Sequence, residues 1–230
     1  MQQKKQTVPA PSKLNLLRQI CNLLPDFLVP RLARETGAQK KVRTFSAWSH
    51  VVALLYSQLT HSIGLNDVCD ALGLHSGPLS SLRGATPPSR NNFSHANRVR
   101  PAAMAEQLFW PVLEHLGQVS PRFVSGRSGK RLARKFHRTI HLVDSTTIPL
   151  IAQCLDWAKH RRRKAAAKCH LRLDLQSFLP RFAIVDTARH NDNRRARELC
   201  AGIHAGEIVI FDKAYIDFDH LADLSRREVF

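Results

Sequence analysis

The chain has 230 residues, of which 35 are Lys or Arg and 18 are Asp or Glu, so its formal net charge is +17 with histidine neutral. Hydrophobic residues make up 43% of the sequence beside 12 Pro and 10 Gly, which is the composition of a folded chain and excludes a disordered basic tail. A folded surface with this charge attracts polyanions, and nucleic acid is the commonest of them, ahead of anionic membranes.

The sequence argues against a membrane or secreted protein. No stretch approaches the roughly 18 apolar residues of a spanning helix, and the N-terminus lacks the apolar segment of a secretory signal. The cysteines never form a C-x-x-C pair, which fits neither a disulfide framework nor a zinc site; they are Cys21, Cys69, Cys154, Cys169 and Cys200. We therefore expect a cytoplasmic protein with reduced cysteines and no membrane partner.

The first half of the chain has a helical pattern. Residues 1–13 are polar and punctuated by proline, so we expect a disordered tail there. Behind it, apolar residues recur at three- and four-residue spacing, which predicts helices over residues 14–24, 27–36, 48–59, 65–72, 91–99 and 101–116, with a turn-rich connector over 76–90. Thr44 is expected to cap the third helix, and Gly73 to end the fourth. Residues 14–119 are thus predicted to be an all-helical domain.

A basic linker, expected over residues 120–136, separates this domain from a region of different periodicity. Alternating and continuous apolar runs predict strands over residues 139–148, 171–175, 182–185 and 207–212, with helices over 193–203 and 217–227. The expected fold class is α+β, with the helical domain followed by a mixed sheet over residues 137–230. This order of elements is compatible with a ribonuclease H-like sheet.

Two aspartates are set in apolar strands. Asp144 interrupts the run HLVDSTTI, and Asp212 closes the run IVIFD. A carboxylate in a half-buried strand is costly unless it is paired or binds a metal, and neighbouring strands could bring the two together. Paired carboxylates hold divalent ions, and such sites catalyse phosphoryl transfer. The alternative is that each Asp ends a strand or caps a turn.

The densest run of positive charge begins at residue 159. It has six cationic side chains and no acid up to residue 168, namely Lys159, Arg161, Arg162, Arg163, Lys164 and Lys168. Such a run is typical of a patch that neutralises the phosphates of nucleic acid without reading the sequence. A solvated face or loop is the alternative, and the alanines at 165–167 fit either a helix or an extended lead-in to the next strand.

A second candidate for DNA contact is the stretch RNNFSHANRVR over residues 90–100. Its side chains, with Asn92 and Arg98 among them, are of the kinds that contact base edges and phosphates. This stretch is therefore a candidate DNA-reading helix, and a plain helical bundle with a polar face is the alternative.

Several segments together resemble one family. In order, HLVDSTTI, WAKHRRRKAAAKCHLRLDL, the HN pair followed by Asp192, and EIVIFDKAYIDFDHL resemble the catalytic domain of DDE-type bacterial insertion-sequence transposases, of the insertion-sequence-four group. The stretch FSAWSHVVALLYSQLTHSIGLNDVCDALG resembles the small helical domain that precedes the catalytic domain in one branch of that family. The resemblance covers about residues 10–228 and implies a ribonuclease H-like fold.

The resemblance also implies a site and partners. Asp144 and Asp212 would be the first two acids of a triad that holds Mg²⁺ or Mn²⁺ for DNA cleavage and strand transfer. The partner would be double-stranded DNA, both the terminal inverted repeats of a transposon and target DNA, in the bacterial nucleoid. The oligomeric state stays open, with a homodimer as the candidate.

The third acid of the family lies in a Tyr-x2-Arg-x3-Glu-x6-Lys pattern, which this sequence does not contain. Neither Glu207 nor Glu228 has the surroundings to replace it. We therefore expect a C-terminally truncated copy, with an incomplete ribonuclease H-like domain and without activity of its own. Two other classes stay open: a non-catalytic protein that occupies transposon ends, and a basic RNA-binding protein in which Asp144 and Asp212 are structural.

Overall fold

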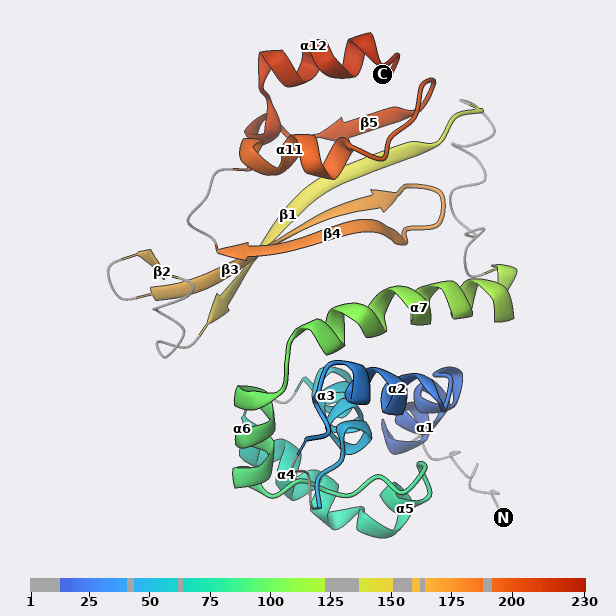
Figure 1. Cartoon of the computed structure of the whole chain (residues 1–230), viewed down its shortest axis with the longest axis vertical. Helices are drawn as coiled ribbons and strands as arrows, with labels where there is room; N and C mark the ends of the chain where they lie inside the picture. Colours follow the sequence, from blue (N-terminus) through green and yellow to red (C-terminus); the bar gives the residue numbers. More distant parts are fainter. Residues whose placement is uncertain are drawn as a thin grey trace, which may run out of the picture. The chain divides into compact units, whose positions relative to one another are not determined.

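A computed structural model of the chain (Figure 1) describes residues 13–40, 44–61, 64–122, 137–150, 159–161, 164–187 and 192–230. The chain forms two compact units, Met1–Val119 and Ser120–Phe230. The expected tail, apart from Lys13, and residues 123–136 of the expected linker lie outside the described residues. Within the described part, no helix is both long and apolar enough to cross a membrane.

The first unit is helical, as predicted, because its apolar residues recur with the helical period and share one core. Its helices are α1 (Lys13–Leu23), α2 (Leu28–Glu35), α3 (Ala47–Thr60), α4 (Leu65–Leu74), α5 (Ser76–Ser80), α6 (Arg90–Val99) and α7 (Ala103–Val119). The buried side chains of Leu17, Val52, Leu72 and Phe93 bring α1, α3, α4 and α6 together in that core.

Two predicted helix boundaries are wrong. Ser46, and not Thr44, caps α3, and its hydroxyl accepts a hydrogen bond from the Ser49 backbone amide at 3.0 Å. Ser46 has extended backbone directly before the first helical residue, which is the geometry a capping side chain requires. Gly73 does not end α4, because the helix continues for one more residue.

The stretch predicted as a connector, residues 76–90, is also more ordered than expected. It begins with α5, and Leu79 of that helix is fully buried. Further along, the Leu82 carbonyl accepts a hydrogen bond from the Trp48 indole at 2.7 Å. The connector is therefore packed on α3 and is part of the core.

The second unit is a mixed sheet with helices. Its described strands are β1 (Ile140–Leu150), β2 (Lys159–Arg161), β3 (Lys164–Asp174), β4 (Pro180–Thr187) and β5 (Ile208–Phe211), and its helices are α11 (Asn193–Cys200), the short 3-10 helix η2 (Lys213–Tyr215) and α12 (Phe218–Arg226). β3 pairs antiparallel with β1, β2 and β4, whereas β5 pairs parallel with β1. A helical region followed by this sheet is consistent with the predicted ribonuclease H-like fold class, which is confirmed.

One strand is much longer than predicted. The expected strand over residues 171–175 begins at Lys164 in the structure, because Ala165, Ala166 and Ala167 pair with residues 148–150 of β1. The alanines are therefore strand and not helix. The basic run of the sequence consequently contributes to β2 and the start of β3.

The helices of this unit pack on one face of the sheet and are tied to each other. Fully buried Leu199 of α11 shares a core with Val143 of β1 and Leu224 of α12. Arg172 on β3 donates to the Leu199 carbonyl at 3.0 Å. Arg227, directly after α12, donates to three more carbonyls, those of Cys200, Ala201 and Ile203, at 3.1, 3.2 and 2.6 Å. The two guanidinium groups bond carbonyls in and directly after the last turn of α11 and place positive charge at its negative end.

Candidate functional site

Asp144 and Asp212 lie side by side on adjacent strands. The parallel pairing of β1 and β5 runs as far as Val143 opposite Phe211, and each aspartate is the residue that follows this pair in the chain. Asp144 lies inside β1, which continues to Leu150, whereas Asp212 follows the end of β5. Sequence reasoning had expected neighbouring strands, and the register puts both acids at the same level of the sheet.

Both carboxylates are exposed to solvent. Each accepts one local hydrogen bond, Asp144 from the Ser145 amide at 2.7 Å and Asp212 from the Ala214 amide at 2.6 Å. Among the described residues, neither carboxylate takes part in an ion pair. Two carboxylates that no described cation neutralises thus lie side by side, and carboxylate oxygens are the donor type that Mg²⁺ and Mn²⁺ prefer.

Tyr215 is buried next to Asp144 and Asp212, and the negative charge of these two aspartates affects the pKa of its hydroxyl. The pKa of the Tyr215 hydroxyl is raised to about 12, chiefly by burial and also by the negative charges of Asp192, Asp144 and Asp212, against a hydrogen bond with Ser145 that lowers it. The phenol therefore lies within electrostatic reach of three carboxylates that come from three separate segments of the chain.

Asp192 belongs to this region, although sequence reasoning gave it no role. Its carboxylate accepts a hydrogen bond from Lys168 Nζ at 2.8 Å and one from Ser145 Oγ at 3.5 Å. It also lies 3.8 Å from His170 Nδ1. The sequence offers one signal for Asp192, which is its position after the HN pair in a segment that resembles the transposase family. Sequence spacing alone, however, does not predict that Asp192 contacts β1 and β3.

The basic run is only partly described. Lys159, Arg161 and Lys164 have backbone positions in β2 and β3, whereas Arg162 and Arg163 lie outside the described residues. The sequence predicts that Lys168 is free to contact phosphate. In the structure, Asp192 forms an ion pair with Lys168, and only 17% of the lysine side chain is exposed. A patch made by the other cations stays a prediction.

Asn92 and Arg98 are exposed on α6, whose opposite face buries Phe93 and Ala96. The Asn92 amide donates weakly to Thr44 Oγ1 at 3.5 Å. An open groove of about 660 Å³ runs beside this helix, and its lining includes Lys40, Asn92, His95 and Arg100 and contains no acidic residue. Arg98 is not part of that lining, so the two predicted DNA-contacting residues share a helix but only Asn92 faces the groove.

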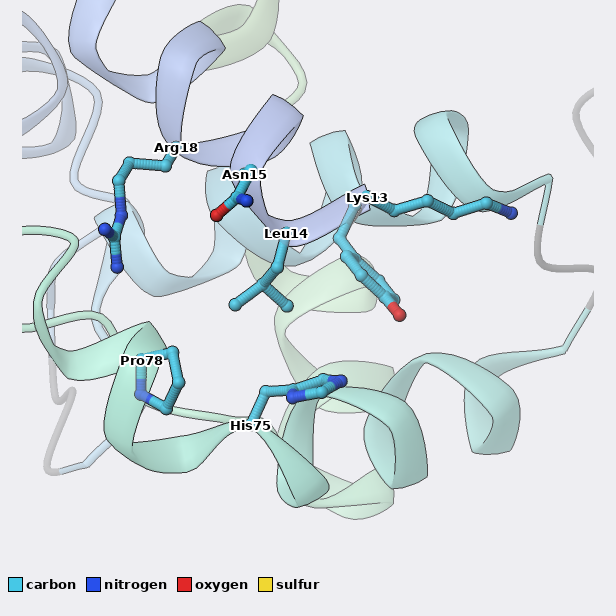
Figure 2. A pocket seen from close by; sticks show the side chains of 7 residues that line it. Lys13, Leu14, Asn15, Arg18, His75 and Pro78 are labelled. Atoms are coloured by element: carbon cyan, nitrogen blue, oxygen red, sulfur yellow. The ribbon is translucent and has the colours of Figure 1, made fainter. Parts of the chain in front are cut away.

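Figure 2 shows a second pocket of the first unit, with a volume of about 320 Å³. Lys13, Arg18 and His75 are part of its lining, and again no acidic residue is. The side chain of Leu14 points into it. These two hollows are thus bordered by basic groups, as expected for a chain with a large positive net charge.

No group of three or more His, Cys, Asp or Glu residues within the described ranges is arranged to hold a metal ion. Among the described residues, Asp144 and Asp212 would be the ligands of such an ion, and water or substrate commonly completes the coordination of Mg²⁺.

Comparison with known families matches both units. Residues 135–230 match a family model described as the transposase DDE domain, and residues 12–82 match one described as a domain of unknown function (DUF4372). No match was found among curated proteins or among solved structures. Residues 135–230 are thus similar to the transposase DDE domain, and residues 12–82 to DUF4372. Transposases with a DDE domain act on DNA and generally use a divalent metal ion. The DDE domain predicted from the sequence is confirmed, whereas the insertion-sequence-four group stays a prediction.

Proposed function

We propose that this protein is the transposase of an insertion sequence of the insertion-sequence-four group, and that Asp144 and Asp212 hold the Mg²⁺ or Mn²⁺ ion that its DNA chemistry requires. The observation that carries the proposal is the register of β1 and β5, which sets the two exposed acids next to each other in the domain that matches the DDE family. The RNA-binding alternative has no comparable support, because it gives the adjacent acids no task.

A divalent ion between these carboxylates would supply Lewis acidity for attack on a phosphodiester. The two aspartates would hold that ion and keep it in place through their oxygen atoms. Their local hydrogen bonds to the Ser145 and Ala214 amides restrict how each carboxylate can rotate. Preorganised ligands of this kind reduce the cost of ordering the site when DNA binds.

The DNA partner would be held by basic groups outside the acid pair. We assign sequence-independent phosphate contact to the basic run of β2 and β3, and contact with the terminal inverted repeats to the groove beside α6, with Asn92 and Arg98. This division follows from chemistry, since a dense run of cations without Asn or Gln chiefly contacts the DNA backbone, whereas Asn beside Arg can also read base edges. Target DNA would be bound by the same basic run.

A second candidate function is occupancy of transposon ends without catalysis. One observation favours it: among the described residues no third acid joins Asp144 and Asp212 as a metal ligand. Two carboxylates bind an ion more weakly and position it less well than three. Under this alternative, the chain binds terminal-repeat DNA but does not nick it.

The test is a Mn²⁺ titration followed by electron paramagnetic resonance, combined with a nicking assay on terminal-repeat DNA. Asp144→Asn and Asp212→Asn keep an acceptor oxygen for the local hydrogen bonds but lose the charge, so each should weaken Mn²⁺ binding by about tenfold or more. Asp219→Asn, at an exposed aspartate of α12 in the same unit, is the matched control and should bind Mn²⁺ like the unsubstituted chain.

The two assays separate the candidates. Magnesium-dependent nicking that disappears in Asp144→Asn supports the catalytic function, whereas metal and DNA binding without nicking supports the second candidate. Unchanged Mn²⁺ affinity in both Asp144→Asn and Asp212→Asn would refute the metal site itself.

A further inference from the structure

A buried hydrogen bond next to the two aspartates has no part in the function proposed so far. It joins Tyr215 Oη to His170 Nδ1 at 3.0 Å, and only 1% and 2% of these residues are exposed. The two rings meet edge to face, with their centroids 6.1 Å apart. Polar groups buried this deeply are costly to leave unpaired, so the position of each ring depends on the other.

This hydrogen bond connects the two segments that carry the aspartates. Tyr215 ends η2, which starts directly after Asp212 and is capped by the Asp212 carboxylate. His170 lies on β3 opposite Ser145 of β1, the residue that follows Asp144. The turn after β5 is thus fastened to the strand pair that holds the other acid.

Asp192, which forms an ion pair with Lys168, lies near the same imidazole nitrogen of His170. The Asp192 carboxylate lies 3.8 Å from His170 Nδ1 and is itself fixed by Lys168 Nζ at 2.8 Å. Asp192 occupies the N-cap position of α11, yet its side chain makes no capping hydrogen bond. An aspartate at this position usually caps its own helix. Its carboxylate is turned instead toward β3, which indicates a role there.

We propose that Tyr215 and His170 are positioning residues, whose hydrogen bond fixes where Asp212 stands relative to Asp144, with Asp192 and Lys168 holding the imidazole. The inference rests on the proposed function, because it concerns the same two carboxylates. The rings of Tyr215 and His170 affect metal affinity by setting the distance between the Asp144 and Asp212 carboxylates. They do not bind the ion themselves. Residues that orient metal ligands in this way affect metal affinity without being ligands.

The experiment measures Mn²⁺ affinity by electron paramagnetic resonance on the full chain, at a temperature where every variant is folded. Tyr215→Phe keeps the ring in the core and removes only the hydroxyl, and we expect it to weaken Mn²⁺ binding about tenfold. His170→Phe should have the same effect. The double variant should lose no more than Tyr215→Phe alone, because that substitution already deletes the hydrogen bond that His170→Phe removes, together with the one to Ser145.

Two controls separate positioning from general stability. Tyr56→Phe changes the other tyrosine of the chain, which is buried in the first unit, and should leave Mn²⁺ affinity unchanged. Leu199→Ala removes a fully buried side chain from the core that contains Tyr215, so it should lower the melting temperature but not the affinity.

The outcomes distinguish this inference from the function on which it rests. Normal Mn²⁺ affinity in Tyr215→Phe, or an equal loss in Leu199→Ala, overturns the positioning role while leaving the metal site intact if Asp144→Asn still loses binding. Normal affinity in Asp144→Asn and Asp212→Asn, or no binding by the unsubstituted chain, overturns both.

Discussion

Four histidines among the described residues are buried, and at three of them burial disfavours the charged form of the ring. Burial lowers the pKa of His50, His170 and His220 below that of an exposed imidazole. His220 is the most isolated of the three, because neither of its ring nitrogens has a hydrogen-bond partner among the described residues. It packs instead against the Phe211 ring, with centroids 6.3 Å apart. The folded second unit therefore favours the neutral form of His220.

This burial predicts loss of stability in mild acid. The unfolded chain binds a proton at His220 with a pKa of about 6.5, whereas the folded chain resists protonation until a lower pH. Stability is therefore complete above the unfolded pKa and falls as the pH drops from there toward the lowered folded pKa. In thermal melts at about pH 7.5 and 5.5, His220→Leu should show a smaller difference in melting temperature than the unsubstituted chain.

The control for this measurement is His204→Gln, since His204 is an exposed histidine of the same unit. It should keep the full pH difference of the unsubstituted chain. If His220→Leu keeps it as well, another group is responsible for the acid sensitivity.

Among the elements, β3 shows best what the sequence could and could not predict. The half with alternating Leu and charged residues was recognised, because its pattern has the period of a strand. The half that begins KAAAK was not, since Ala and Lys have little strand propensity and only pairing with β1 makes them extended. The same limit applies to the site: Asp144 and Asp212 stood out as acids in apolar strands, whereas Asp192 joins them through the tertiary fold alone.

The basic segment at β2 and β3 predicts a salt effect at the scale of the element. Replacing Arg161, Arg162 and Arg163 by Ala should weaken binding to all duplexes about equally, because phosphate contacts carry no sequence information. The slope of log affinity against log salt should become shallower by up to about 3, near 0.9 for each lost contact. The measurement is a salt titration of terminal-repeat and random duplexes.

Asn92→Ala and Arg98→Ala are the comparison variants in the same titration. They should reduce binding to terminal-repeat DNA more than to random DNA, since α6 is the proposed reader. An unchanged salt slope in the triple variant would show a solvated surface at β2 and β3, and a loss confined to the cognate duplex would make that segment the reader.

For the molecule as a whole, two separate cores predict two unfolding transitions. Leu72 is fully buried in the core of the first unit and Leu199 in that of the second. Truncating either leucine to Ala should cost about 2–5 kcal/mol, from lost burial and the remaining cavity. Differential scanning calorimetry should therefore show Leu72→Ala and Leu199→Ala each lowering a different transition. One transition that both variants lower equally would mean that the units unfold together.

The arginine bonds at the end of α11 have a consequence for how the second unit opens. Arg227 follows α12 but is bonded to the carbonyls after α11, and Arg172 reaches the same helix end from β3. The last turn of α11 cannot fray without breaking bonds to both neighbours, and α12 cannot detach without exposing that turn. Helix ends normally exchange their amide hydrogens by independent local fluctuations. We therefore expect the end of α11, α12 and the end of β3 around Arg172 to open together, so their amide hydrogens should exchange at similar rates.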